Sequence, residues 1–184
     1  MKHLFPFLVL SGALFTSANA SAIDFRNERE RRSAIVWQAR SCIGEIGWHD
    51  VATCVSMIWV HMDIAERTGI PLERVVRQFS AAVKPEHNVH RPWIFELDWS
   101  GRRPSMMRRG SWEEWRRDRW FATLSIVADT VDGLIAPHCY GARSYGSARI
   151  DSNPNPATLE RRDCLPGSGQ AFWYWKEEHD PGRT

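Results

Sequence analysis

Apolar residues recur at intervals of three and four over most of residues 25–83, the spacing that places them on one face of an α-helix. We expect three consecutive helices here: the first over residues 25–46, the second capped by Asp50 and ended by Gly69, and the third running from Pro71 to Val83. The positions predicted to face inward are Ile35, Ala39, Cys42, Ile43 and Ile46, then Val51, Cys54, Val55, Ile58, Met62 and Ala65, then Leu72, Val75, Val76, Phe79 and Val83.

Residues 84–110 break the helical pattern, because three prolines there exclude a long helix. Trp93, Phe95, Leu97 and Trp99 alternate with other residues, which predicts a short strand or extended hairpin region. A helix-capping pattern, Ser111-Trp112-Glu113-Glu114, then predicts a helix that continues to about Asp132.

The C-terminal segment, residues 134–184, is rich in glycine and proline and predicts a loop-rich arm with a short aromatic segment from Ala171 to Lys176. No repeat or change of composition divides the chain after its N-terminus. We therefore expect one mainly α domain of α+β type, residues 23–184, with a short extended hairpin region and this arm.

The N-terminus has the pattern of a secretory signal over residues 1–22. Lys2 and His3 precede an apolar run from Leu4 to Phe15, and small residues follow at the places that signal peptidase reads. The alternative is an uncleaved anchor, but the run is shorter than the roughly 20 residues that span a bilayer. We expect export to the periplasm or the medium, and no integral membrane segment after cleavage.

The composition argues against a nucleic-acid partner, because the formal net charge of the 184 residues is only +2. Arginines nevertheless cluster locally, and two interpretations remain: a surface for anionic wall polymer or membrane, and the one we prefer, a solvated helix face paired with nearby acids. The clustered arginines are Arg102, Arg103, Arg108, Arg109, Arg116, Arg117 and Arg119, and the acids are Glu113, Glu114 and Asp118.

The chain has four cysteines, an even number that suggests disulfides in an exported protein. Of the three pairings we favour Cys42–Cys54 and Cys139–Cys164, because each joins segments close in sequence. The first bridge would pin two consecutive helices, and the second would tie the C-terminal arm to the body. A four-cysteine zinc site is the alternative, but the spacing contains no Cys-x-x-Cys pair.

Glu45 is the sharpest chemical candidate, because it lies at the predicted end of the first helix, between Gly44 and Gly47 and close to Trp48. A carboxyl group beside an aromatic surface loses hydration, which favours its protonated form. A glutamate kept protonated can act as a general acid on a glycosidic oxygen. The alternative is a solvated residue at a helix end.

Three segments here resemble the cell-wall hydrolases of the spore-cortex-lytic (SleB-like) type, which are relatives of lysozymes and lytic transglycosylases. The resemblance covers residues 35–83, and a weaker one, to phage-like hydrolases, covers 136–146. At the end of the second helix Val60-His61 stands where that family often has Asn-Arg. The three segments are Gly44-Glu45, then Val51-Ala52-Thr53-Cys54-Val55-Ser56-Met57-Ile58-Trp59, then Val75-Val76-Arg77-Gln78-Phe79-Ser80.

The resemblance implies a lysozyme-like fold, with Glu45 as the catalytic acid and Gln78, Phe79 and Tyr145 in the substrate cleft. The implied function is cleavage of the glycan strands of peptidoglycan, without a cofactor. A hydrolysing glycosidase usually needs a second carboxylate, for which Asp50 and Asp151 are candidates that no spacing singles out. A lytic transglycosylase needs only one, which slightly favours that reaction over a muramidase.

The ten tryptophans suit sugar recognition, because the apolar faces of sugars stack on indole. Trp48 and Trp93 lie in predicted loops and are the better cleft candidates. Trp112, Trp115 and Trp120 lie at helical spacing, which favours a place in the core.

Two other function classes remain as alternatives. One is a non-catalytic envelope module that binds the wall or a partner in the envelope machinery through tryptophan and arginine. The other is a zinc-dependent wall peptidase or amidase that uses His87, His90 and His138, although they lie in no established zinc motif. A nucleophile built from Cys139 and His138 is weaker still, because adjacent residues of an extended chain point apart.

Overall fold

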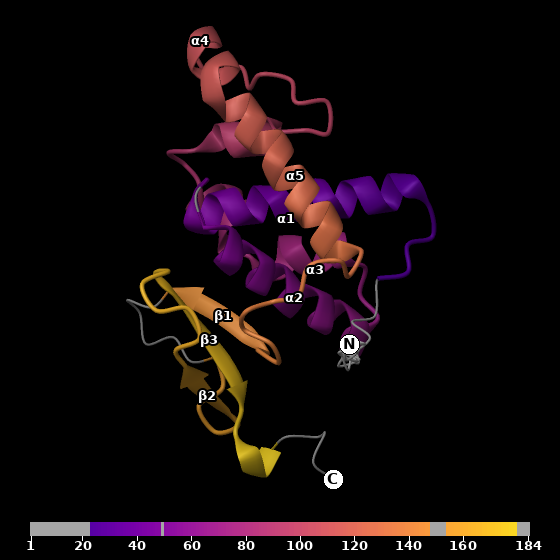
Figure 1. Ribbon diagram of the computed structural model, residues 1–184, viewed down its shortest axis with the longest axis vertical. Coiled ribbons are helices and arrows are strands. Elements are labelled where there is room, and N and C mark those ends of the chain that lie inside the picture. The colour runs from indigo at the N-terminus through magenta and orange to yellow at the C-terminus, as the bar shows by residue number, and fades with distance from the viewer. Residues whose placement is uncertain (1–22, 49, 148–153, 180–184) are drawn as a thin grey trace, which may run out of the picture.

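The computed structural model describes residues 23–48, 50–147 and 154–179, so the predicted signal segment and Asp151 lie outside the described residues. The described chain is mainly helical, with a small antiparallel sheet on one side of the helices (Figure 1). The α-helices are α1 (Glu28–Ile46), α2 (Val51–Thr68), α3 (Leu72–Phe79), α4 (Arg109–Ser111) and α5 (Arg117–Val131). The 3₁₀ turns are η1 (Ala81–Val83), η2 (Pro85–His87), η3 (Pro92–Glu96) and η5 (Glu177–His179), the π turn is η4 (Trp112–Arg116), and the strands are β1 (Ser144–Ser147), β2 (Leu159–Arg162) and β3 (Gln170–Trp175).

The second helix begins and ends as its sequence predicts, whereas the first ends as predicted but begins at Glu28 and not at residue 25. Asn27 and Asp50 cap α1 and α2 by accepting from the backbone N–H groups of Glu30 and Thr53. Gly69 ends α2 in the left-handed conformation, with a φ of 65°, which a glycine adopts without the steric cost of a Cβ.

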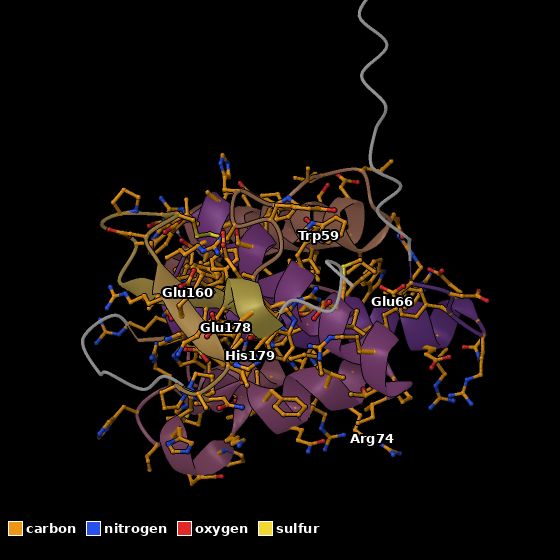
Figure 2. All side chains as sticks on the ribbon, turned by 90° about the horizontal axis from the view of Figure 1, so that it is seen from below. Trp59, Glu66, Arg74, Glu160, Glu178 and His179 are labelled. Atoms are coloured by element: carbon orange, nitrogen blue, oxygen red, sulfur yellow. A yellow bond between two sulfur atoms is a disulfide. The ribbon has the colours of Figure 1, made fainter. Side chains whose placement is uncertain are left out.

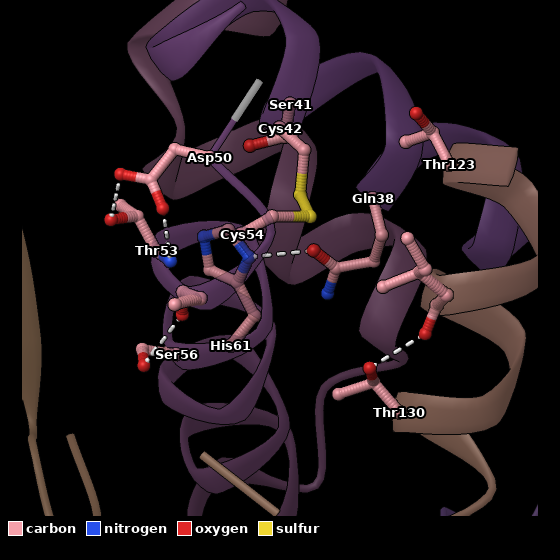
Figure 3. Close-up of a disulfide and its surroundings, with 12 residues drawn as sticks. Gln38, Ser41, Cys42, Asp50, Thr53, Cys54, Ser56, His61, Thr123 and Thr130 are labelled. Atoms are coloured by element: carbon pink, nitrogen blue, oxygen red, sulfur yellow. Dashed lines mark hydrogen bonds between the residues drawn. A yellow bond between two sulfur atoms is a disulfide. The ribbon is translucent and has the colours of Figure 1, made fainter. Parts of the chain in front are cut away.

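The core lies between α1, α2, α3 and α5, which bury most of the positions predicted to face inward. Figure 3 shows the Cys42–Cys54 bridge joining α1 to α2, and the second bridge joins Cys139 to Cys164, so both predicted pairings are confirmed. Val51 and Phe79 were predicted to face inward, but they are 49% and 51% exposed. Both stand at helix ends, where the neighbouring helices no longer cover them.

Helix α3 ends at Phe79, before the predicted end at Val83, because Ser80 takes an extended conformation (φ −84°, ψ 120°). The chain then forms the 3₁₀ turn η1, which packs against the end of α1. The early end of α3 is important, because it turns the Ser80 side chain into the protein, where it is fully buried.

The strand predicted over residues 93–99 does not form, since the first part of this segment belongs to the 3₁₀ turn η3, which ends at Glu96. Pro92 at its start has the φ that a helical turn requires. The buried side chains are Ile94 and Leu97, three residues apart, which fits the three-residue repeat of a 3₁₀ turn and not the alternation of a strand.

The capping role predicted for Ser111 is also wrong, because Ser111 has helical φ and ψ and the helix begins at Arg109. The π turn η4 adds a residue to the helix, which brings Trp112 and Trp120 onto one buried face. Their indole N–H groups donate to the carbonyl oxygens of Gly101 and Asp98. Trp115 is 38% exposed and so lies only partly in the core.

The C-terminal arm contains more regular structure than predicted, because β1, β3 and β2 form an antiparallel sheet in that order. Phe172 and Trp173 of the central strand are buried, and Tyr145 of β1 pairs with Phe172. The sheet packs on Met57 and Val60 of α2. Among the described residues, no helix combines the length and the hydropathy needed to cross a bilayer.

Candidate functional site

Glu45 lies in the last turn of α1 and is half-buried, so its side chain does not point into open solvent. Its Oε1 accepts two hydrogen bonds, from the Ser80 hydroxyl (3.1 Å) and from the Ala82 backbone N–H (3.2 Å). In the described part of the chain, both hydrogen bonds that this carboxyl group accepts fall on Oε1. The same oxygen is therefore fixed from two directions, by the end of α3 and by η1.

Gly44 explains how η1 comes this close to Glu45. A Cβ at position 44 would lie 2.6 Å from Ala82 Cβ and 2.9 Å from Ala82 O, far inside normal contact. Asn88, which is buried, holds η1 from the other side through its Nδ2, which donates to Ala82 O. The Gly-Glu dipeptide therefore places a backbone donor on the carboxyl group.

Behind Glu45 lies a line of buried and partly buried polar side chains from α1, α2, β1 and Ser80, which follows α3. The Ser41 hydroxyl donates to Ser80 Oγ (2.8 Å), and Tyr145 OH lies 3.0 Å from His61 Nε2. His61 Nδ1 in turn lies 2.9 Å from Gln38 Oε1, the contact that Figure 3 marks across α1 and α2. Ser41, Ser80, His61 and Gln38 are all fully buried.

The titratable members of this line remain neutral near pH 7. Burial lowers the pKa of His61 to about 3. Burial also raises the pKa of Tyr145, and the negative charge of Glu45 raises it further, while Ser41 and Ser80 act in the opposite direction. Glu45 therefore lies at one end of a polar line whose other members carry no charge.

The residues predicted to contact sugar differ in how far they are buried and in which way they point. Trp48 and Trp93 stack in parallel, with ring centres 6.2 Å apart and planes at 4°, and both are partly buried against the core. Gln78 and Phe79 are exposed at the end of α3, directly before Ser80. Tyr145 was predicted to line a sugar cleft, but the structure turns its hydroxyl inward to His61.

Asp50, a candidate second carboxylate, is occupied at the start of α2. Its oxygens accept from the backbone N–H of Thr53 (3.0 Å) and from the Thr53 hydroxyl (2.5 Å). This arrangement makes Asp50 a helix cap.

Sequence reasoning missed Gln38, Ser41, His61 and Ala82 as parts of the site. One signal was present, because Gln38, Ser41 and Glu45 follow one another at intervals of three and four on a helix and so form a polar stripe on its face. A polar stripe beside an apolar one indicates buried hydrogen bonding.

A separate cavity of about 740 Å³ lies at the opposite end of α1 and α2, and Glu45 does not line it. Its walls come from residues 23–26, the second half of α2 and residues 137–143. Figure 2 labels Trp59 and Glu66, which line it from α2. Charges of both signs line it, including the ion pair between Asp63 and Arg143.

His87, His90 and His138, the ligands of the alternative zinc site, are all exposed. Within residues 23–48, 50–147 and 154–179, no group of three His, Cys, Asp or Glu side chains could hold a metal ion. Cys139 is bridged to Cys164 and so has no free thiolate.

The arginine-rich region combines ion pairs with stacking on aromatic rings. Arg109 pairs with Glu113 (3.1 Å), one of the acids predicted as partners. Two guanidinium groups lie over the exposed ring of Trp115, with Arg116 5.0 Å and Arg119 4.6 Å from the ring centre.

Comparisons with models of protein families, with curated proteins and with solved structures found no match.

Proposed function

We propose that the protein cleaves the glycan strands of peptidoglycan through a lysozyme-like domain, with Glu45 as the general acid and base. The observation that carries this proposal is the geometry of Glu45, a half-buried carboxyl group with two donors on one oxygen. In a protonated carboxyl group the oxygen that accepts two hydrogen bonds is the carbonyl oxygen. The proton then resides on Oε2, where it can be transferred to substrate.

The reaction begins when Oε2 donates its proton to the glycosidic oxygen, and the bond from that oxygen to the anomeric carbon breaks. In a transglycosylase the resulting carboxylate takes the proton of the same sugar's 6-hydroxyl, whose oxygen bonds to the anomeric carbon. The product is a 1,6-anhydro sugar, and Glu45 is protonated again. This route needs one carboxylate, and the capping role of Asp50 supports it over a muramidase, in which Glu45 would activate water.

The partly buried pair Trp48 and Trp93 and the exposed residues Gln78 and Phe79 supply candidate contacts for sugar. Trp48 follows Glu45 by three residues, and Phe79 precedes Ser80, so both groups are tied to the elements that hold the acid. Indole rings offer stacking surface together with an N–H donor.

The two disulfides support export to an oxidising compartment, either the periplasm or the exterior of the cell. On this proposal residues 1–22 direct export and residues 23–184 act on the wall. Mass spectrometry of the exported protein would measure its N-terminus, which we expect close to Ile23.

The decisive experiment compares the loss of turbidity of purified walls with the mature protein and with Glu45→Gln. We expect the substitution to abolish clearing while the melting temperature changes little, because Gln retains an acceptor for Ser80 and Ala82. Glu86→Gln, at an exposed glutamate of η2, is the matched control and should clear walls normally.

The products separate the remaining possibilities. Anhydro ends on the released muropeptides would establish a transglycosylase, and reducing ends a muramidase. Clearing by Glu45→Gln at the wild-type rate would refute the proposal, and loss of clearing in EDTA would favour a zinc peptidase. Sedimentation of both proteins with walls, without clearing by either, would establish a binding module.

A further inference from the structure

His61 is a fully buried polar residue that the proposed reaction does not use directly. It projects from α2 between Gln38 of α1 and Tyr145 of β1, and these are the polar groups that contact its ring. A buried polar group is retained when its hydrogen bonds have a structural or a chemical use. The contacts of His61 point to such a use, because they lead toward Glu45.

The contact with Gln38 sets which ring nitrogen of His61 carries the hydrogen. With the Gln38 amide in this orientation its carbonyl oxygen can only accept, which assigns the hydrogen to Nδ1 of His61. A neutral imidazole has a single N–H, which leaves Nε2 as an acceptor. The hydroxyl of Tyr145 therefore donates its proton to His61 (3.0 Å).

This donation determines what Tyr145 offers to the serines on its other side. Its hydroxyl lies close enough to Glu45 to feel the charge of that carboxylate, and it also faces Ser41 and Ser80. With its one proton committed to His61, the Tyr145 oxygen presents only lone pairs to them. The serine hydroxyls keep their own direction, in which Ser41 donates to Ser80 and Ser80 donates to Glu45 Oε1.

We propose that His61, held by Gln38, is a positioning residue for Glu45, which it orients through Tyr145, Ser41 and Ser80. By taking the Tyr145 proton it leaves Ser41 and Ser80 as the donors on this side of Glu45, so that Ser41 donates to Ser80 and Ser80 fixes Oε1. Oε2 remains the oxygen that exchanges its proton with substrate. This inference rests on the proposed function of Glu45.

Steady-state cleavage of purified walls by the mature protein tests the role. His61→Phe removes the acceptor for Tyr145 and should lower kcat by roughly tenfold to a hundredfold, with KM for wall nearly unchanged, because the acid is misplaced while the sugar contacts remain. His61→Gln keeps an acceptor and should recover most of this loss.

The matched control is Thr130→Val. Thr130 is as fully buried as His61, but within the described chain its hydroxyl bonds to the local carbonyl of Ile126 on α5 alone. It should lose stability without a change in kcat. If His61→Phe keeps the kcat of Thr130→Val, the role proposed for His61 is refuted.

Nitrogen-15 NMR of the imidazoles tests the hydrogen-bond direction without any activity. The signal that His61→Gln removes should report a protonated Nδ1 and an unprotonated Nε2 between about pH 5 and pH 8. A hydrogen on Nε2 would overturn the direction of the line and with it the proposal.

Glu45→Gln distinguishes a failure of the proposed function from a failure of the role proposed for His61. If that variant clears walls, the proposed function fails, and the role of His61 fails with it. If only Glu45→Gln is inactive and His61→Phe is fully active, the function stands and the inference alone is wrong.

Discussion

The two ends of the α1 and α2 pair hold polar groups in opposite ways. At the Glu45 end one carboxyl group adjoins a line of buried neutral side chains, and Gly44 allows close packing around it. At the other end Asp63 and Arg143 form an ion pair on the wall of a cavity of about 740 Å³. A carboxyl group among fixed neutral dipoles has its hydrogen bonds imposed by the fold, whereas an ion pair beside open space can recruit water.

The largest effect we expect from this difference is acid destabilisation through His61. Its pKa falls from 6.5 in the unfolded chain to about 3 in the fold, so between these values the unfolded state binds more protons. The free energy of unfolding therefore decreases as the pH falls through this window, by about 1.4 kcal/mol per pH unit. Urea titrations of the wild type and of His61→Gln at several pH values would measure it. The variant should lose this slope, and parallel curves would contradict the assignment.

The second prediction concerns the disulfide between Cys139 and Cys164. Cys139 lines the cavity, and the chain that follows it leads into β1 and Tyr145. Replacing Cys139 and Cys164 together by alanine should lower the free energy of unfolding by about 3 kcal/mol and lower wall cleavage as well. Denaturation curves and cleavage rates measure both effects. The comparison is the replacement of Cys42 and Cys54 by alanine, because α1 and α2 remain joined there by a short loop.

The third prediction tests the close packing at the Glu45 end. Gly44→Ala should force η1 away from α1, cost about 1–3 kcal/mol in stability and slow wall cleavage by about a hundredfold, because Ala82 N–H withdraws from Glu45. Thermal unfolding and kcat would measure the two losses. A fully active Gly44→Ala variant would show that the backbone donor is dispensable.

The smallest effect belongs to the cavity end. Asp63→Asn removes the ion pairs with Arg143 and Arg67, and we expect a loss of stability below about 1 kcal/mol with no change in cleavage, because water can hydrate the separated groups. The same denaturation and cleavage assays apply. A large loss here would remove the contrast between the two ends.

The parts of the fold that follow from the sequence are those set by neighbours along the chain. The first two helices, their caps at Asn27 and Asp50 and their glycine ends depend on contacts within four residues. Both disulfides were also predictable, because each joins cysteines that are close in sequence, with separations of 12 and 25 residues.

What the sequence could not reveal depends on tertiary packing. The residues from Trp93 to Trp99 alternate like a strand, but burial of Ile94 and Leu97 imposes a 3₁₀ turn. The π turn before α5 forms so that Trp112 and Trp120 can share a buried face.

The candidate site also has parts that local sequence predicts and parts that depend on tertiary packing. Glu45 could be predicted from its neighbouring glycines and from a family resemblance. The polar stripe from Gln38 to Glu45 is also visible in the local sequence. The contact between His61 and Tyr145 joins residues 84 positions apart, and no local sequence pattern predicts it.

The wide sequence span of this polar line bears on when the protein becomes able to act. Gln38 and Glu45 emerge early in synthesis, whereas Tyr145 is positioned only once the C-terminal strands have docked on α2. Contacts between distant parts of a chain form late in folding, since the loop between them must first close. On the proposed function the chain is therefore latent while it is unfolded and in transit, and the cell's own wall is spared until maturation is complete.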